Sequence, residues 1–136
     1  MEVHAYIEVT DLQAGIDFYT QGLGLSLRRR LDDCWVELTG ASIPIFLLSD
    51  RPPVARLGER DIARDFSRHW TPVHLDFVTD NLEGAVQQAE AAGGVLEREI
   101  QVREWGRMAS MADPFGNGFD LIELAPGGYD RIERTT

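Results

Sequence analysis

Lysine is missing from this chain, and cysteine occurs only once. All 13 basic residues are arginine, so a lysine cannot serve as a Schiff base or a general base. The single Cys34 cannot form a disulfide within the chain, which fits a reducing cytoplasm. No apolar run approaches the roughly 18 residues of a membrane span, and no charged and then apolar leader follows Met1. We therefore expect a cytoplasmic protein that does not bind or cross a membrane.

Positive charge is also scarce. Acidic residues number 23, which gives a formal net charge of −10 and a pI near 4.6. This balance argues against binding to the phosphate backbone of nucleic acids and favours a neutral or cationic small molecule as the partner. A chain of 136 residues suits one domain with a sizeable core.

The sequence contains an internal repeat. The stretch from His4 to Leu12 returns as the stretch from His74 to Leu82, at an offset of 70 residues. Each copy opens with the alternation of a strand, passes a Thr/Asp break and continues with helical spacing. The register indicates a duplicated supersecondary unit.

In module one, residues 1–50, we expect a strand, a helix and three further strands. The first strand, Val3–Val9, places His4, Tyr6 and Glu8 on one face. A helix should follow from Leu12 to the glycines at 22 and 24. The remaining strands are expected near Leu25–Arg30, Cys34–Leu38 and Ile43–Leu48.

The linker, residues 51–71, is densely charged, and we expect a helical turn at Asp61–Arg68. Module two, residues 72–125, repeats the order of module one, and its first strand carries His74 and Asp76 on one face. The tail, residues 126–136, has few apolar residues and should be loosely held. Module two is expected to contain a strand at Pro72–Thr79, a helix at Leu82–Ala92, and strands near Val95–Val102, Trp105–Met111 and Gly118–Leu124.

Three stretches carry a family resemblance: residues 4–24, residues 74–94, and the turn Asp113-Pro114-Phe115-Gly116-Asn117. In these stretches the chain resembles the vicinal oxygen chelate superfamily, which includes glyoxalase I, bleomycin-resistance proteins and extradiol dioxygenases. The resemblance implies an α+β fold in which two βαβββ modules form a curled, barrel-like mixed sheet around a cleft. It also implies a single glyoxalase/bleomycin-resistance/dioxygenase-like domain over residues 1–136 and favours a homodimer.

The resemblance further implies a metal site. Metal-using relatives take ligands from the first and last strands of each module, which by position are His4, His74 and Asp120, with Asp120 as the catalytic carboxylate. The fourth position falls near Leu47, which cannot bind a metal. Two imidazoles and one carboxylate would suit a divalent ion such as Fe, Mn, Ni or Zn. Glu123 is the rival of Asp120, and its odd offset points it to the opposite face of the strand.

Three functions compete, the third being a catalytically silent protein with a regulatory or unknown ligand. The first is a metal-dependent lyase, isomerase or oxygenase that chelates vicinal oxygens of a small molecule, and the paired histidines favour it. The second is a metal-free small-molecule or drug-binding protein of the bleomycin-resistance kind, which the acidic charge favours. Glyoxalase I itself is disfavoured, because Leu47 stands where that enzyme has a glutamate. The candidate substrate-binding residues are Tyr6, Glu8, Asp76 and Trp105.

Overall fold

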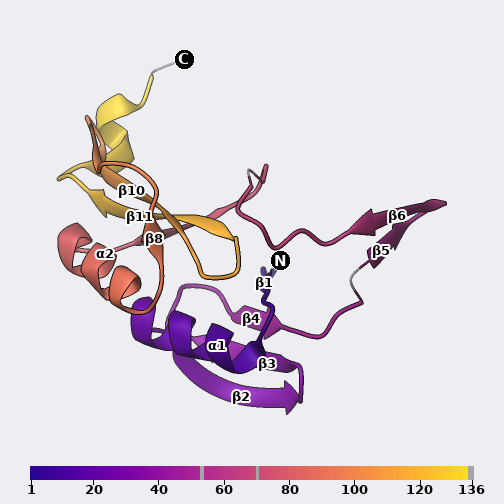
Figure 1. Cartoon of the computed structure of the whole chain (residues 1–136). Coiled ribbons are helices and arrows are strands. Elements are labelled where there is room, and N and C mark those ends of the chain that lie inside the picture. Colours follow the sequence, from indigo (N-terminus) through magenta and orange to yellow (C-terminus); the bar gives the residue numbers. More distant parts are fainter. Residues whose placement is uncertain (53, 70, 135–136) are drawn as a thin grey trace.

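The computed structural model describes residues 1–52, 54–69 and 71–134. Module one consists of β1 (Ala5–Glu8), α1 (Leu12–Asp17), a π-helical continuation η1 (Phe18–Gly22), β2 (Ser26–Asp32), β3 (Trp35–Thr39) and β4 (Ile45–Leu48). Its sheet has the order β1-β4-β3-β2, with β1 parallel to β4 (Figure 1). The first and last strands of the module are therefore neighbours, as the expected βαβββ unit requires.

Module two repeats this arrangement. It consists of β7 (Leu75–Val78), α2 (Leu82–Ala91), β8 (Val95–Leu96), β9 (Gln101–Arg103), β10 (Gly106–Ala112) and β11 (Gly118–Leu124). The sheet has the order β7-β11-β10-β8, with β9 also paired to β10 and β7 parallel to β11. The described residues thus form two curled sheets of an α+β fold, which are not joined into a closed barrel.

The strand expected at Val95–Val102 is two short strands. Leu96 pairs with Met111, and Gln101 pairs with Met108. The segment from Leu96 to Gln101 therefore advances five residues while its partner β10 advances three. The extra residues form a bulge that breaks the ladder between β8 and β9. Alternation in the sequence does not reveal such an insertion, because it depends on the partner strand.

The linker forms a β-hairpin, and the helical turn expected at Asp61–Arg68 is wrong. The hairpin strands are β5 (Val54–Leu57) and β6 (Arg60–Ala63). Gly58, with φ of 62°, lies in the two-residue connection, a conformation that favours glycine. The hairpin projects from the body of the molecule (Figure 1). In the tail, a 3-10 helix η2 (Gly128–Ile132) lets Tyr129 pack on Trp105 with ring centroids 5.2 Å apart.

Equivalent residues begin the two helices. The side chain of Asp11 accepts a hydrogen bond from the Ala14 N–H, and that of Asn81 accepts one from the Gly84 N–H. Both caps satisfy a backbone donor that the first turn leaves without a helical partner. Neither helix is long and apolar enough to cross a membrane, and the same holds for the other described helical segments.

One hydrophobic core extends across both modules. Phe18 and Tyr19 of η1 are almost fully buried, and Phe18 packs against Phe119 of β11 with ring centroids 6.1 Å apart. A Cβ atom at Gly22 would lie only 3.0 Å from the Cβ of Ala92, so glycine permits η1 and α2 to approach closely. The helices of the two modules therefore pack against each other on one side of the sheets (Figure 1).

A buried polar junction also connects the modules. The Tyr19 hydroxyl donates to Asp113 Oδ2 at 2.7 Å, and the Asp113 carboxylate is only 4% exposed. Asn117 donates through Nδ2 to Asp113 at 2.9 Å and to the Glu8 carbonyl of β1 at 3.1 Å. The turn that precedes β11 is thereby tied to the helix and first strand of module one.

Replacing Tyr19 with Phe tests this junction. Removal of the hydroxyl takes one donor from a buried carboxylate, so we expect the free energy of unfolding to fall by about 1–3 kcal/mol. Tyr129→Phe, which changes an exposed tyrosine, should leave stability within about 0.5 kcal/mol of wild type. Urea denaturation monitored by circular dichroism measures both values.

The same pair of variants has a pH signature. Burial, followed by the charge of Asp113, raises the pKa of Tyr19 well above its usual value. The stability linked to this raised pKa is present below the unfolded pKa of about 10 and is lost as pH rises through the folded pKa. Wild type and Tyr129→Phe should therefore weaken above about pH 10, and Tyr19→Phe should lack this component. Identical pH dependence in all three proteins would contradict the junction.

Candidate metal centre

The helices cover one face of each sheet, and alternate side chains project from the other face, which we call the cleft face. On β7, the half-buried Phe77 packs against the core and Leu75 shares its strand face, whereas the exposed Asp76 lies on the cleft face. On β11, Phe119 and Leu121 join the core, and Asp120 lies on the cleft face between them. Strand alternation thus brings a carboxylate from each strand to the same surface.

His74, Asp76 and Asp120 form a compact cluster on this surface. Asp76 and Asp120 are Cα partners across the parallel β7–β11 pair. His74 Nε2 lies 3.1 Å from Asp76 Oδ1 and 3.4 Å from Asp120 Oδ2. One ligand atom from each of the three residues lies within 4.8 Å of the other two.

The cluster holds more negative charge than its own imidazole neutralises. Burial and, secondarily, the charge of Asp120 raise the pKa of Asp76, although the opposing effect of His74 is larger than that of Asp120. Side-chain exposures of 39%, 40% and 16% for His74, Asp76 and Asp120 show that Asp120 is the most enclosed member. A cation placed between the two carboxylates would relieve their mutual repulsion.

The donor set fits a divalent metal ion. One imidazole and two carboxylates are ligands that Fe(II), Mn(II), Ni(II) and Zn(II) accept, and three protein ligands leave coordination positions for a substrate. A pocket of about 330 Å³ adjoins the cluster and is lined by His74, Asp120, Ser110 and Arg68 among others. The open coordination positions would therefore face a space that can hold a small molecule.

His4 lies outside the cluster. Its Nε2 is 3.0 Å from Glu2 Oε1, and its ring lies 5.2 Å from that of Phe46. The structure thus brings together His74 and Asp120 of the expected ligand set and adds Asp76 in place of His4. The two-residue spacing of His74 and Asp76 is the sequence signal that could have revealed this, because such residues share a strand face.

The residue of module one that corresponds to Asp120 is Phe46, and the expected position near Leu47 is one residue too far. Tyr6 pairs with Phe46 as Asp76 pairs with Asp120. Leu47 is completely buried among the core residues. Module one therefore has an aromatic side chain at the position where module two has the carboxylate.

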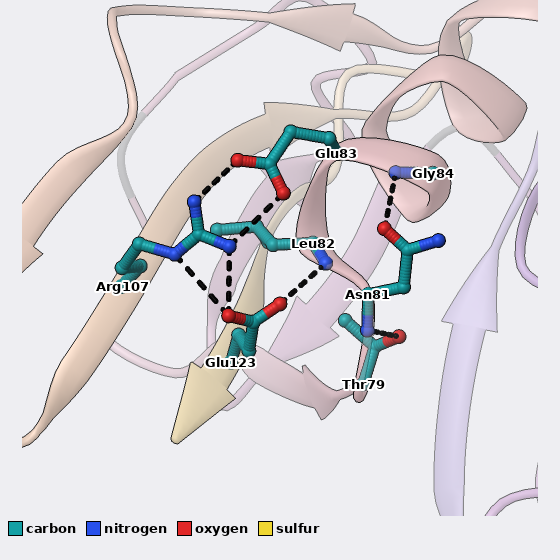
Figure 2. A network of polar contacts seen from close by, with 7 residues as sticks. All are labelled: Thr79, Asn81, Leu82, Glu83, Gly84, Arg107 and Glu123. Atoms are coloured by element: carbon teal, nitrogen blue, oxygen red, sulfur yellow. Dashed lines mark hydrogen bonds and ion pairs between the residues drawn. The ribbon is translucent and has the colours of Figure 1, made fainter. Parts of the chain in front are cut away.

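Glu123 lies on the other face of β11 and stabilises the start of α2 (Figure 2). Its carboxylate accepts a hydrogen bond from the Leu82 N–H at 2.9 Å and pairs with Arg107 at 2.7 Å. Arg107 also pairs with Glu83 in the first turn of the helix. The Leu82 N–H and, next, Arg107 hold the pKa of Glu123 below its usual range. Glu123 is thus engaged in a structural network away from the cleft face.

The other candidate residues occupy separate places. Glu8 forms an ion pair with Arg64 of the linker, which also donates to the Pro52 carbonyl at 2.6 Å. Tyr6 and His4 line a second pocket of about 460 Å³, which also reaches His74. We call it the seam pocket because residues of both β1 and β7 line it. Trp105 packs on Tyr129 of the tail.

Comparison with known proteins places this fold in a family. A glyoxalase-like domain model matches residues 4–122. The anthracycline biosynthesis protein DnrV of Streptomyces peucetius is 32% identical over 88% of this chain, which spans 40% of DnrV's length. A probable lactoylglutathione lyase of Vibrio cholerae is 27% identical, with 89% of this chain and 88% of the lyase covered.

A solved structure agrees with these matches at the level of the fold. A glyoxalase/bleomycin resistance protein/dioxygenase family enzyme from Burkholderia phytofirmans superposes with a TM-score of 0.68 at 17% identity, covering 90% of this chain and 97% of the other. The matched model spans nearly all of both modules. The chain therefore belongs to the glyoxalase-like family of the vicinal oxygen chelate superfamily, as its repeated motifs predicted.

Proposed function

We propose that this protein is a divalent-metal-dependent enzyme, a lyase, isomerase or oxygenase, that acts on a small molecule bound at the cleft face. His74, Asp76 and Asp120 would hold the metal. The observation that carries the proposal is the convergence of three ligand atoms within 4.8 Å beside an open pocket. Fe, Mn, Ni and Zn all suit this donor set.

The metal would supply Lewis-acid polarisation of adjacent substrate oxygens. The protein would position it through the register of β7 and β11, which fixes the two carboxylates opposite each other. Asp120 is the most enclosed ligand and lines the same pocket as Ser110, so we assign it the catalytic carboxylate role. Tyr6 and Glu8 would orient the substrate from the first strand of module one, whereas Asp76, expected in the same role, would act through the metal it helps to hold.

The named relatives support an enzyme acting on small molecules. The Vibrio protein is described as a probable lactoylglutathione lyase, and this chain covers most of its length. DnrV is described as an anthracycline biosynthesis protein, but this chain covers less than half of it. We carry over only the class of small-molecule chemistry from these names.

A metal-free binding protein is the second candidate. Module one has the aromatic side chains of His4, Tyr6 and Phe46 at the positions where module two has the ligand cluster. Such a surface suits ligand binding without chemistry. Metal uptake separates the two candidates.

The first prediction from this proposal concerns metal binding. After removal of metals with a chelator, the protein should take up about one Mn(II) per chain, measured by calorimetry and elemental analysis. Asp120→Asn should weaken this affinity by more than the roughly 10–100-fold that loss of an outer-shell partner costs. Glu123→Gln, three residues along the same strand, should bind Mn(II) like wild type. Failure of wild type to bind Fe(II), Mn(II), Ni(II) or Zn(II) would refute the metal-dependent enzyme.

The second prediction concerns the raised pKa of Asp76. The pKa of Asp76 is higher in the folded protein than in the unfolded chain, where it is about 3.9. The folded protein therefore keeps its full stability below about pH 3.9 and loses part of it as pH rises through the folded pKa. Asp76→Asn removes this loss, so it should raise stability at pH 7 and make little difference near pH 3.5. The gain should be below about 1 kcal/mol, because solvent screens a side chain that is 40% exposed.

Thermal denaturation of the metal-free protein measures this effect, with Asp80→Asn as the control at an exposed position. Saturating Mn(II) should reverse the order, because wild type gains binding free energy that the variant partly loses. A less stable Asp76→Asn protein at pH 7 without metal would contradict the strained cluster.

The third prediction is a homodimer. The projecting hairpin exposes Leu57 by 69%, Ile62 by 48% and Val54 by 42%. A two-stranded hairpin is marginally stable alone, so a covering partner would stabilise it. Sedimentation velocity at micromolar concentration should show a dimer. Leu57→Ser with Ile62→Ser should weaken it, whereas Val102→Ser, at an exposed position of β9, should not. A monomeric wild type would overturn this proposal.

A further inference from the structure

The internal repeat permits a direct comparison of the two halves of the cleft face. The 70-residue offset aligns His4 with His74 and Tyr6 with Asp76. The parallel strand pairs then align Phe46 with Asp120. The same three positions of the duplicated frame therefore hold a ligand cluster in module two and an aromatic group in module one.

The aromatic group is a stack with one open face. The rings of Tyr6 and Phe46 are stacked, with centroids 4.8 Å apart and planes 11° from parallel. Trp35 and His4 flank Phe46, with ring centroids 6.0 Å and 5.2 Å from it. Phe46 is 6% exposed beneath these neighbours, whereas Tyr6 is 51% exposed. The stack therefore ends in an aromatic ring that is half open to solvent.

The open ring borders the space that leads to the ligand cluster. Tyr6, His4 and His74 line the seam pocket of about 460 Å³. Its wall includes the apolar side chains of Phe77 and Phe119. The volume lies within the usual range of small-molecule sites, which combine apolar walls with a few polar groups.

We propose that the His4, Tyr6 and Phe46 stack is an aromatic-ring subsite, and that the ligand is a planar aromatic molecule, either uncharged or cationic. Its ring would stack on Tyr6, and its polar end would point across the seam pocket toward His74. The identification of the ligand as a substrate rests on the proposed function.

The charges around the stack favour that ligand class over an anionic one. Glu2 lies beside His4. Glu8 follows Tyr6 by two residues on β1, and its carboxylate forms an ion pair with Arg64. The electron-rich face of an aromatic ring attracts cations, and the chain carries a net charge of −10. An aromatic anion would be repelled by the electron-rich ring face and by the negative charge of the protein.

The test uses the planar cation proflavine as the probe and chelator-treated protein, so that the result does not depend on a metal. Calorimetry should show binding at one site per chain. Tyr6→Ala should weaken binding by roughly tenfold, because a stacked aromatic pair contributes about 0.5–1.5 kcal/mol beyond area burial. Tyr6→Phe keeps the ring and should stay within about threefold of wild type.

The matched control is Tyr129→Ala. Tyr129 is also 51% exposed and also packs against an aromatic ring, that of Trp105, but it lies in the tail. This variant should bind proflavine like wild type. The anionic probe 8-anilinonaphthalene-1-sulfonate should bind wild type more weakly than proflavine does.

Three results would overturn the subsite: no proflavine binding by wild type, equal losses in Tyr6→Ala and Tyr129→Ala, or unchanged binding in Tyr6→Ala. The outcome is separable from that of the metal proposal. Tyr6→Ala should still take up Mn(II), and Asp120→Asn, whose side chain lies outside the lining of the seam pocket, should lose Mn(II) affinity while it retains proflavine. If proflavine binding depends on Tyr6 but the protein takes up no metal, the aromatic subsite is supported and the metal-dependent enzyme is refuted.

Discussion

The buried carboxylate of Asp113 is the constraint on which the arrangement of the two modules depends. A charge away from water is costly unless donors surround it, and here the Tyr19 hydroxyl, the N–H groups of Phe115 and Asn117, and the Asn117 amide supply them. These bonds fix the turn before β11 and orient the helix of module one. Because Asn117 also reaches the Glu8 carbonyl, the same turn holds β1 near module two, and the seam pocket lies between them.

Within each module, the register between the first and last strands determines which side chains lie next to each other on the cleft face. The parallel pairing of β7 with β11 places Asp76 opposite Asp120, and the equivalent pairing of β1 with β4 places Tyr6 opposite Phe46. Both pairs lie on the face opposite the helices, and the exposed members, Tyr6 and Asp76, can be substituted with little loss of packing. Duplication of the unit thus supplied two equivalent surfaces that were free to differ. One carries ligands for a cation, and the other carries stacked rings.

The sequence predicted most of the fold because periodicity and capping are local. The alternation around His4 and His74, the helix starts near Asp11 and Asn81, and the glycines after each helix all give direct signals. The structure differs from the expectations where it depends on pairing with a distant strand. The bulge between β8 and β9, the choice of Phe46 over Leu47, and the addition of Asp76 to the cluster each follow from inter-strand register. The hairpin at 54–63 was hidden by its high charge, which is typical of linkers.

In the part of the chain that the structure describes, arginine pairs directly with the structural carboxylates but not with those of the ligand cluster. Glu123 pairs with Arg107 and the buried Glu37 pairs with Arg28 and Arg29, so these carboxylates are neutralised where the fold requires it. Among the described residues, Asp76 and Asp120 form ion pairs with His74 alone, although Arg68 lines the same pocket as Asp120 and its charge interacts with that carboxylate at longer range. Burial is the main cause of the raised pKa of Asp76, and the charge of Asp120 adds to it, so the ionised Asp76 carboxylate lowers stability. A bound cation would offset the repulsion between the two carboxylates, which is why we propose this cluster, more than the two aligned histidines, as the site of chemistry.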